Sequence, residues 1–434
     1  MNKFVVSVGL AATGMMAIET TASAQYSLLG DTKNWNASGS LRGFYDSNYA
    51  IGPSKAGSYG LEVSPTITAT IPLTQTQTGF LYTYGLQWYE ARQNLGVDAY
   101  DQSHSFNVWV DHAFNERWNV KIIDSLNIGQ EPELLQPGTG TPQTPAVTFR
   151  IAGDNLANNA TVTLHTDWTR QFSTELFYSS GFYQYSSQST YAPQLDRIDN
   201  TPGLDLQWHF TPELTGFVGY QFQDELYTDG APIGNYGPPE PGFPNGKGVY
   251  WSNSRDNLNH YGYVGVSDTF LPNLTGSARV GVQVFQTIND PVGDSTTTSP
   301  YADLNLVYTY LPGDNVELGF TETRNPTDVV SVNSQNYSIT QDQLSSTLYL
   351  ALNHHITHKL LFSAIGKFCD SSYNGGQFDN QTQTLYSLGL NANYAFTRHF
   401  SAEAGFNYDD NSAPAGTGQS YTRDRYYIGI SVAY

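Results

Sequence analysis

The sequence predicts an all-β protein: a transmembrane, antiparallel, up-and-down β-barrel of about 18 strands, within a range of about 16 to 20. Three observations predict this class: the composition, a two-residue alternation of apolar and polar side chains, and the sorting of short and long connections. Of the 434 residues, 14% are aromatic and 13% are charged, whereas average soluble domains are about a quarter charged. Tyr, Thr, Ser, Asn and Gln take the place of charge, and the aromatic and β-branched residues favour strands.

The chain opens with the features of a secretory signal peptide. Lys3 gives a positive start, Phe4 to Ile18 form a mostly apolar run, and Ala22-Ser23-Ala24 is a small-residue cleavage site before Gln25. We therefore expect a signal peptide at residues 1–24. After it, no stretch approaches the ~20 consecutive apolar residues of a membrane-spanning helix.

Alternation predicts the strands. From Tyr59 to Ile71 every odd position is apolar and every even position is small or polar. Each such segment has about the length that crosses a bilayer at a tilt. The candidate strands are 35–46, 58–72, 79–91, 103–114, 117–128, 158–169, 172–186, 201–210, 214–226, 258–271, 274–287, 300–311, 315–325, 344–357, 359–370, 383–396, 400–410 and 422–434.

The connections fall into two kinds. Those after even-numbered strands are short and resemble one another, as in "HFTPELTGF" at 209–217, whereas those after odd-numbered strands are long, notably 129–157 and 227–257. Outer-membrane barrels have this asymmetry, because their short turns face the periplasm and their long loops face outward. An even strand count returns both ends to the periplasmic side, so we expect a short periplasmic segment at 25–34 and the barrel at 35–434.

The last strand ends the chain on an aromatic residue, with apolar residues at every second position before it. This ending, "YYIGISVAY", resembles the C-terminal signature that the barrel-assembly machinery reads in bacterial outer-membrane proteins. Together with the signal peptide and the loop asymmetry, it makes the chain similar to outer-membrane barrels of the putative beta-barrel porin 2 family. The resemblance implies a bacterial outer-membrane location after signal-peptide-dependent export, and a channel role. The candidate assembly signal is Tyr426, Ile428, Ile430, Val432 and Tyr434.

The alternation assigns each strand residue to one of two faces. Apolar positions are expected to face lipid, with aromatic residues near the strand ends in a girdle at the membrane interface. The girdle candidates are Phe114, Trp118, Trp168, Phe172, Trp208, Phe210, Phe270, Tyr310, Phe396 and Phe400. The lumen-lining candidates on the other face are Arg42, Glu62, Asp111, Lys121, His165, Asp167, Glu175, Asp205, Arg279, Asp303, Glu317, Lys367 and Glu403.

Three of these acids, Glu175, Glu317 and Glu403, occupy equivalent positions after the short turns. They are interpreted either as an acidic ring that favours cations, or as carboxylates that pair with basic neighbours and keep the lumen wet. Loop 129–157 is a candidate pore constriction. Loop 227–257, with Tyr227, Tyr236, Phe243, Tyr250 and Trp251, either stacks on carbohydrate or is a mobile external loop.

Catalysis and cofactors have little support. His165 and Asp167 share one strand face without an assignable third group, and His354, His355 and His358 lie near a turn without an acidic or Cys ligand beside them in sequence, so no metal site is predicted. No cofactor motif occurs, and no cofactor is expected. Acidic residues outnumber basic ones 39 to 19, which argues against nucleic acid as a partner. The expected partners are outer-membrane lipids, lipopolysaccharide, the assembly machinery, small solutes or polysaccharide, and a second copy of the chain in a homo-oligomer.

Three functions follow as hypotheses. The first is passive diffusion of small hydrophilic solutes, with a preference for cations. The second, which the family resemblance suggests, is a conduit for exopolysaccharide export, for which the inward aromatics Trp109, Phe177, Tyr183 and Tyr349 are weak support. The third is a closed structural or adhesive barrel whose external loops bind partners.

Overall fold

The computed structural model describes residues 34–434 except 94, 96–97, 130–154, 186–191, 239–246 and 334. Its main feature is one 18-stranded antiparallel sheet, together with a separate two-stranded hairpin. The barrel strands are β1 (Trp35–Asp46), β2 (Ser58–Pro72), β3 (Thr76–Tyr89), β4 (Tyr100–Ala113), β5 (Trp118–Gly129), β6 (Asn155–Asp167), β7 (Phe172–Gln184), β8 (Arg197–His209), β9 (Leu214–Tyr227), β12 (Asn257–Leu271), β13 (Leu274–Thr287), β14 (Thr296–Leu311), β15 (Asp314–Asn325), β16 (Thr340–Thr357), β17 (Leu360–Gly375), β18 (Thr382–Ala395), β19 (Phe400–Ser412) and β20 (Tyr421–Ala433).

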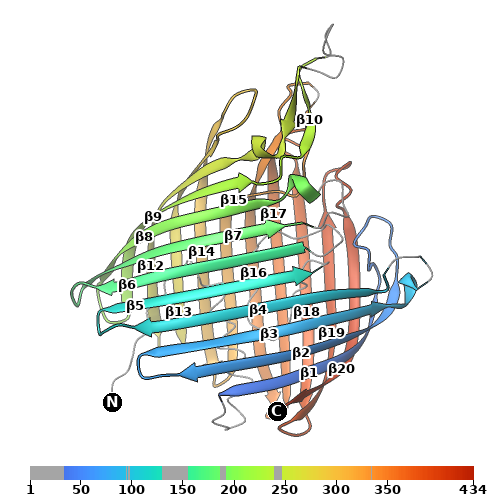
Figure 1. Ribbon diagram of the computed structural model, residues 1–434. Helices are drawn as coiled ribbons and strands as arrows, with labels where there is room; N and C mark the ends of the chain where they lie inside the picture. Colours follow the sequence, from blue (N-terminus) through green and yellow to red (C-terminus); the bar gives the residue numbers. More distant parts are fainter. Residues whose placement is uncertain are drawn as a thin grey trace.

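Every barrel strand pairs with its neighbours in chain order, and the last strand pairs with the first. The closing contact runs from Ser38↔Ala433 to Asp46↔Arg425 between β1 and β20. Closure leaves no sheet edge unpaired, which is what a sheet requires to span a bilayer. In Figure 1 the strands of the near wall, β2 to β8, cross those of the far wall, β14 to β17, at a steep angle, as strand tilt in a barrel requires.

The predicted up-and-down barrel, its strand count and the sorting of its connections are confirmed. Two residues join β12 to β13, and four join β8 to β9, whereas the connections at the other end are longer. Several strands extend further toward the long-loop end than the alternation predicts: β8 begins at Arg197 and β17 ends at Gly375. Above the bilayer both faces of a strand are wet, so pairing continues where the hydrophobic period has already ended.

The long-loop end carries structure that the sequence did not predict. The hairpin of β10 (Pro232–Tyr236) and β11 (Gly248–Trp251) rises there at the top of Figure 1. Three short 3₁₀ turns, η2 (Glu90–Arg92), η3 (Ala192–Gln194) and η4 (Ser252–Arg255), belong to loops at the same end. Among the residues that the structure describes, no helix is long and apolar enough to cross a membrane.

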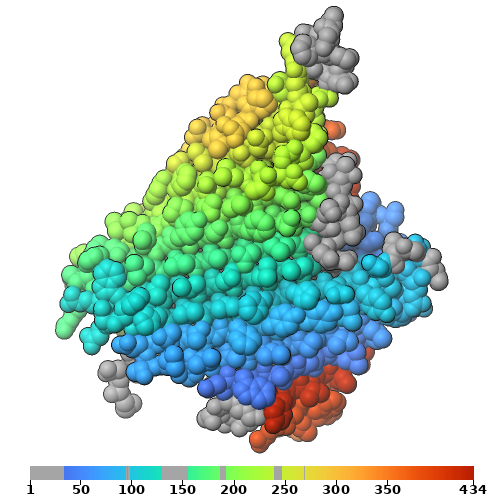
Figure 2. All heavy atoms as spheres, in the orientation of Figure 1, coloured from blue at the N-terminus to red at the C-terminus, as the bar shows by residue number. Residues whose placement is uncertain are grey.

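The outer surface of the wall is apolar. Leu204, Leu206, Val218, Val264 and Val280 are all more than two-fifths exposed, on four strands that lie side by side. The side chains of the near strands form a continuous surface in Figure 2. Such exposure of aliphatic side chains fits a surface that faces hydrocarbon.

Candidate functional site

Arg42 identifies the inner face of the barrel. Its Nη1 lies 2.9 Å from Oε1 of Glu62 on β2, and its Nε lies 2.8 Å from Oε1 of Glu403 on β19. Strand β20 separates β1 from β19, so the two side chains reach each other over a distance of about two strand spacings. Side chains meet in this way only on the concave side of a closed sheet.

The register places every predicted lumen residue on that concave face, opposite the exposed apolar side chains. Glu62 pairs with Arg42, Asp111 with Lys121, His165 with Glu175, and Arg279 with Asp303. Several of these pairs bring an acid beside a base. The role of these residues in conduction stays a prediction.

Two clusters of ion pairs lie on the inner wall among the predicted lumen residues. Arg425 joins the Arg42 cluster through Glu62 at 3.2 Å. On the other side of the barrel, Asp205 accepts hydrogen bonds from the hydroxyl of Tyr263 at 2.6 Å and from Nη2 of Arg279 at 3.3 Å. Partly buried charges need such partners, because an unpaired charge away from water costs several kcal/mol.

The three acids of the proposed ring do occupy equivalent places, each being the fourth residue of its strand, but their surroundings differ. Glu403 is ion-paired with Arg42. Glu175 stands directly opposite Asp205 in the register and near the Arg279 cluster. Glu317 accepts hydrogen bonds from two neutral donors, Asn305 Nδ2 and the Tyr349 hydroxyl, both at 2.9 Å. Neither of these two contacts brings a positive charge to Glu317.

The inward aromatic side chains lie against glycines of the neighbouring strands. A Cβ added at Gly203 would come within 2.1 Å of the Phe177 ring, and one at Gly319 within 2.1 Å of the Tyr349 ring. Trp109 covers Gly79 in the same manner. The Phe177 ring is buried, whereas Trp109 and Tyr349 are only partly buried, and their role in a polysaccharide conduit stays a prediction.

With this geometry in place, the comparison with known families is decisive. The family model described as "Putative beta-barrel porin 2" matches residues 36–434. The chain belongs to this porin family. A comparison with curated proteins gives no match.

Solved outer-membrane proteins are similar to this porin at low sequence identity. The outer membrane protein opdK from Pseudomonas aeruginosa is 9% identical, with 92% of this chain and 99% of that chain covered and a TM-score of 0.44. OccAB4 from Acinetobacter baumannii is 10% identical, with 93% and 99% covered and a TM-score of 0.42. The FrpB iron transporter from Neisseria meningitidis is 10% identical, with 89% and 63% covered and a TM-score of 0.42.

The loops at the outer mouth of this porin contact one another. Of the predicted stacking aromatics, Tyr227 and Tyr250 are buried, and Tyr250 packs edge-on against Tyr236 with ring centroids 5.3 Å apart. Trp251 is half exposed, whereas Phe243 lies outside the described residues. Burial raises the pKa of the nearby Asp256 carboxyl, although the backbone amide of Tyr227 donates to it at 2.7 Å.

The predicted constriction, loop 129–157, lies outside the described residues except at its two ends. The structure therefore leaves that prediction untested, as it does the signal peptide.

The girdle candidates of this porin cluster at the short turns. Phe210 is 64% exposed beside Trp208, and the Phe396 and Phe400 rings stack with centroids 5.4 Å apart across one turn. Along β20 the five candidates of the assembly signal all point outward and are 44 to 70% exposed. These positions suit a membrane interface and a lipid-facing strand, and both assignments stay predictions.

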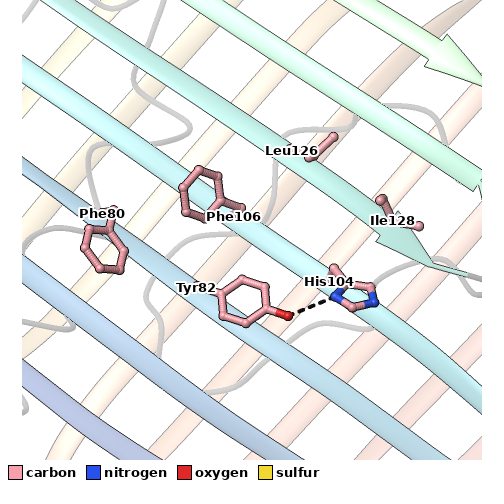
Figure 3. Close-up of a pocket in the computed structure, with 6 residues that line it drawn as sticks. All are labelled: Phe80, Tyr82, His104, Phe106, Leu126 and Ile128. Atoms are coloured by element: carbon pink, nitrogen blue, oxygen red, sulfur yellow. Dashed lines mark hydrogen bonds between the residues drawn. The ribbon is translucent and has the colours of Figure 1, made fainter.

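Two apolar grooves occur on the outer surface rather than in the lumen. One is lined by Phe80, Tyr82, His104, Phe106, Leu126 and Ile128 (Figure 3). There the Tyr82 hydroxyl and Nδ1 of His104 lie 2.9 Å apart. The second groove is formed by the aliphatic residues around Val218 and Val264. Since both grooves are lined by outward-facing side chains, they belong to the lipid-facing surface.

Histidine contacts in this porin are structural. Ser173 Oγ lies 2.9 Å from Nε2 of His209, but Ser173 is fully buried and also donates to Gln207. The third group on His209 is Thr215 rather than an acid. A serine that no substrate can reach, without an orienting carboxylate, does not form a nucleophilic triad.

The expectation that no acid accompanies His354 and His355 is wrong. Asp314, on the neighbouring strand, lies 3.1 Å from Nδ1 of His354 and 2.6 Å from Nδ1 of His355. Register pairing brings this carboxylate in from 40 residues away, which the local sequence does not reveal. Among the described residues, no group of three His, Cys, Asp or Glu side chains could hold a metal ion.

Proposed function

We propose that this porin is a passive diffusion channel for small hydrophilic solutes, with a preference for cations. The observation that carries the proposal is the closed wall of 18 strands with charged and polar side chains on its concave face. Barrels of 16 to 18 strands enclose an aqueous channel. Carboxylates outnumber Arg and Lys among the inner-wall residues named above, which supports the cation preference.

The proposal includes the targeting of the chain. Residues 1–24 act as the signal peptide, 25–34 lie in the periplasm, and the lipid-facing wall contacts outer-membrane lipids and lipopolysaccharide. The experiment is reconstitution of the mature chain in a planar bilayer. Stepwise conductance is the expected result. A bilayer that stays silent at high protein load would favour a closed structural or adhesive barrel.

Glu317 provides the test of selectivity. Because its hydrogen-bond partners are neutral, Glu317→Gln removes one negative charge from the inner wall without leaving a base unpaired. We expect the ratio of cation to anion permeability, measured from the reversal potential in a salt gradient, to fall by about twofold. Glu90→Gln, at an exposed external turn, is the matched control and should leave the ratio unchanged. An equal ratio in both variants would argue against a role for Glu317 in ion selection.

A further inference from the structure

The connection between β15 and β16 leaves the wall and passes inward; we call its described residues, 326–333 and 335–339, the mouth strap. Pairing between β14 and β15 ends at Ala302↔Glu322, although β14 continues to pair with β13 as far as Thr296. Beyond that point, the side chain of Gln283 on β13 replaces β14 as the hydrogen-bond partner of the end of β15. Its Oε1 accepts the amide of Arg324 at 2.7 Å, and its side chain is completely buried. The chain therefore crosses the inner side of β14.

The strap then contacts the wall far from its own strands. Val330 packs against a buried apolar cluster that β6, β7 and the following loop form, with Tyr183, Ala192 and Leu195 among its members. Strands β8, β9, β12, β13 and β14 all lie between β7 and β15 in the barrel. Since Val330 reaches the β7 side, the strap spans the mouth as a chord.

Polar contacts hold the strap near both of its ends. Nη2 of Arg255 donates to the carbonyl of Thr327 at 2.6 Å, and the Tyr250 hydroxyl donates to the carbonyl of Tyr337 at 2.5 Å. Both donors come from the loop that joins β9 to β12. Arg255 is completely buried, with its guanidinium 4.7 Å from the centre of the Tyr227 ring. Side chains of the connection between β9 and β12 thus pack against the strap.

The stretch between these two contacts is also held in place. Val329 is buried with Tyr373 and Phe378 at the top of β17, and a bridge joins Val332 to Ile339. Gln341, just after the strap, donates to the carbonyl of Ser254 at 3.3 Å. The strap is therefore a packed segment rather than a free loop.

We propose that the mouth strap is the constriction of the channel and sets the size limit for solutes. This inference rests on the proposed channel function. A backbone segment with side chains on both faces occupies roughly 10 Å, a large part of the lumen of a barrel of this size. Because the ends of the strap and the stretch between them are packed, the strap narrows the mouth.

The first experiment replaces residues 328–337 with Gly-Ser-Gly in the full chain. We expect single-channel conductance to rise by about twofold or more, and larger neutral sugars to enter proteoliposomes in swelling assays. The control deletes residues 291–294, an exposed stretch of the β13–β14 loop, and should conduct as the unaltered protein does. Folding of each variant is checked by its heat-modifiable mobility on gels.

The outcomes separate the two proposals. If the unaltered protein conducts and the strap variant has the same conductance and size limit, the constriction is refuted while the channel stands. If only the strap variant conducts, the strap closes the mouth, and both the passive channel and the size limit are refuted for the unaltered protein. If neither conducts, the channel function fails and the constriction fails with it.

The second experiment tests the position of the strap without shortening it. In a Cys369→Ser background, Val330→Cys is combined with Leu195→Cys, and mild oxidation should link the two residues in folded protein. The pair Val330→Cys and Val292→Cys is the control and should stay unlinked. Oxidation should leave the conductance unchanged, because the strap already lies there. Failure of the first pair to link in folded protein would overturn the position of the strap.

Discussion

Gly219 has no side chain, and residues of the two neighbouring strands occupy the space above it on the inner wall. Gly219 of β9 stands between Asp205 of β8 and Tyr263 of β12 in the register. The Tyr263 ring lies over it, so that the hydroxyl reaches Asp205 at 2.6 Å. The sequence indicated an inward Asp205, but it gave no sign that a tyrosine two strands away binds it.

Gly219→Ala tests this arrangement. The added Cβ would lie 2.1 Å from Cε2 of Tyr263 and 2.2 Å from Oδ1 of Asp205, so the ring and its hydrogen bond must shift. We expect the free energy of unfolding to fall by about 1–3 kcal/mol, measured by urea titration in detergent micelles. Gly262→Ala on β12, where a Cβ meets nothing within 4 Å, should change it little. Equal stability of the two variants would contradict the packing role of Gly219.

At the scale of elements, five of the eight short turns share one hydrogen-bond pattern. A side-chain oxygen at the second position accepts the backbone amides two and three residues later, as Thr211 does from Glu213 at 3.3 Å and Leu214 at 3.0 Å. This is the ST-turn and Asx-turn geometry. The residues that act in this way are Asn115, Thr169, Thr211, Thr357 and Thr397. The sequence alone predicted the turns because this signal is local.

Thr211→Val removes the acceptor and keeps the size of the side chain. Two exposed amides of the turn then lose their partner, and we expect a loss of about 0.5–1.5 kcal/mol in unfolding free energy. Thr211→Asn should retain most of the stability, because Asn115 fills the same role in another turn. Urea titrations of the two variants make the comparison. A valine variant as stable as the asparagine variant would show that the hydroxyl contributes nothing.

At the scale of the whole molecule, the barrel wall separates lipid from a polar interior, so two adjacent residues of β18 face different surroundings. Leu388 points outward and is 40% exposed, whereas Ser387 points inward between Lys367 and Asp409 in the register. In lipid bilayers, Leu388→Arg should cost about 2–4 kcal/mol, because it places a charge in hydrocarbon. Ser387→Arg should cost much less, since Asp409 stands beside it in a polar interior. Folding titrations in liposomes measure both, and equal costs would mean that the two faces are not distinct solvents.

The sequence by itself determined the class of fold, a count of about eighteen strands and the sorting of short and long connections. These properties depend on residues that are neighbours in the chain, through a period of two and a repeated turn. Only the tertiary structure decided that Arg42 meets Glu403, 361 residues away, and that Val330 reaches the β7 side of the mouth. Such contacts arise because closure and curvature of the sheet bring distant strands together, and no local pattern records which strands those are.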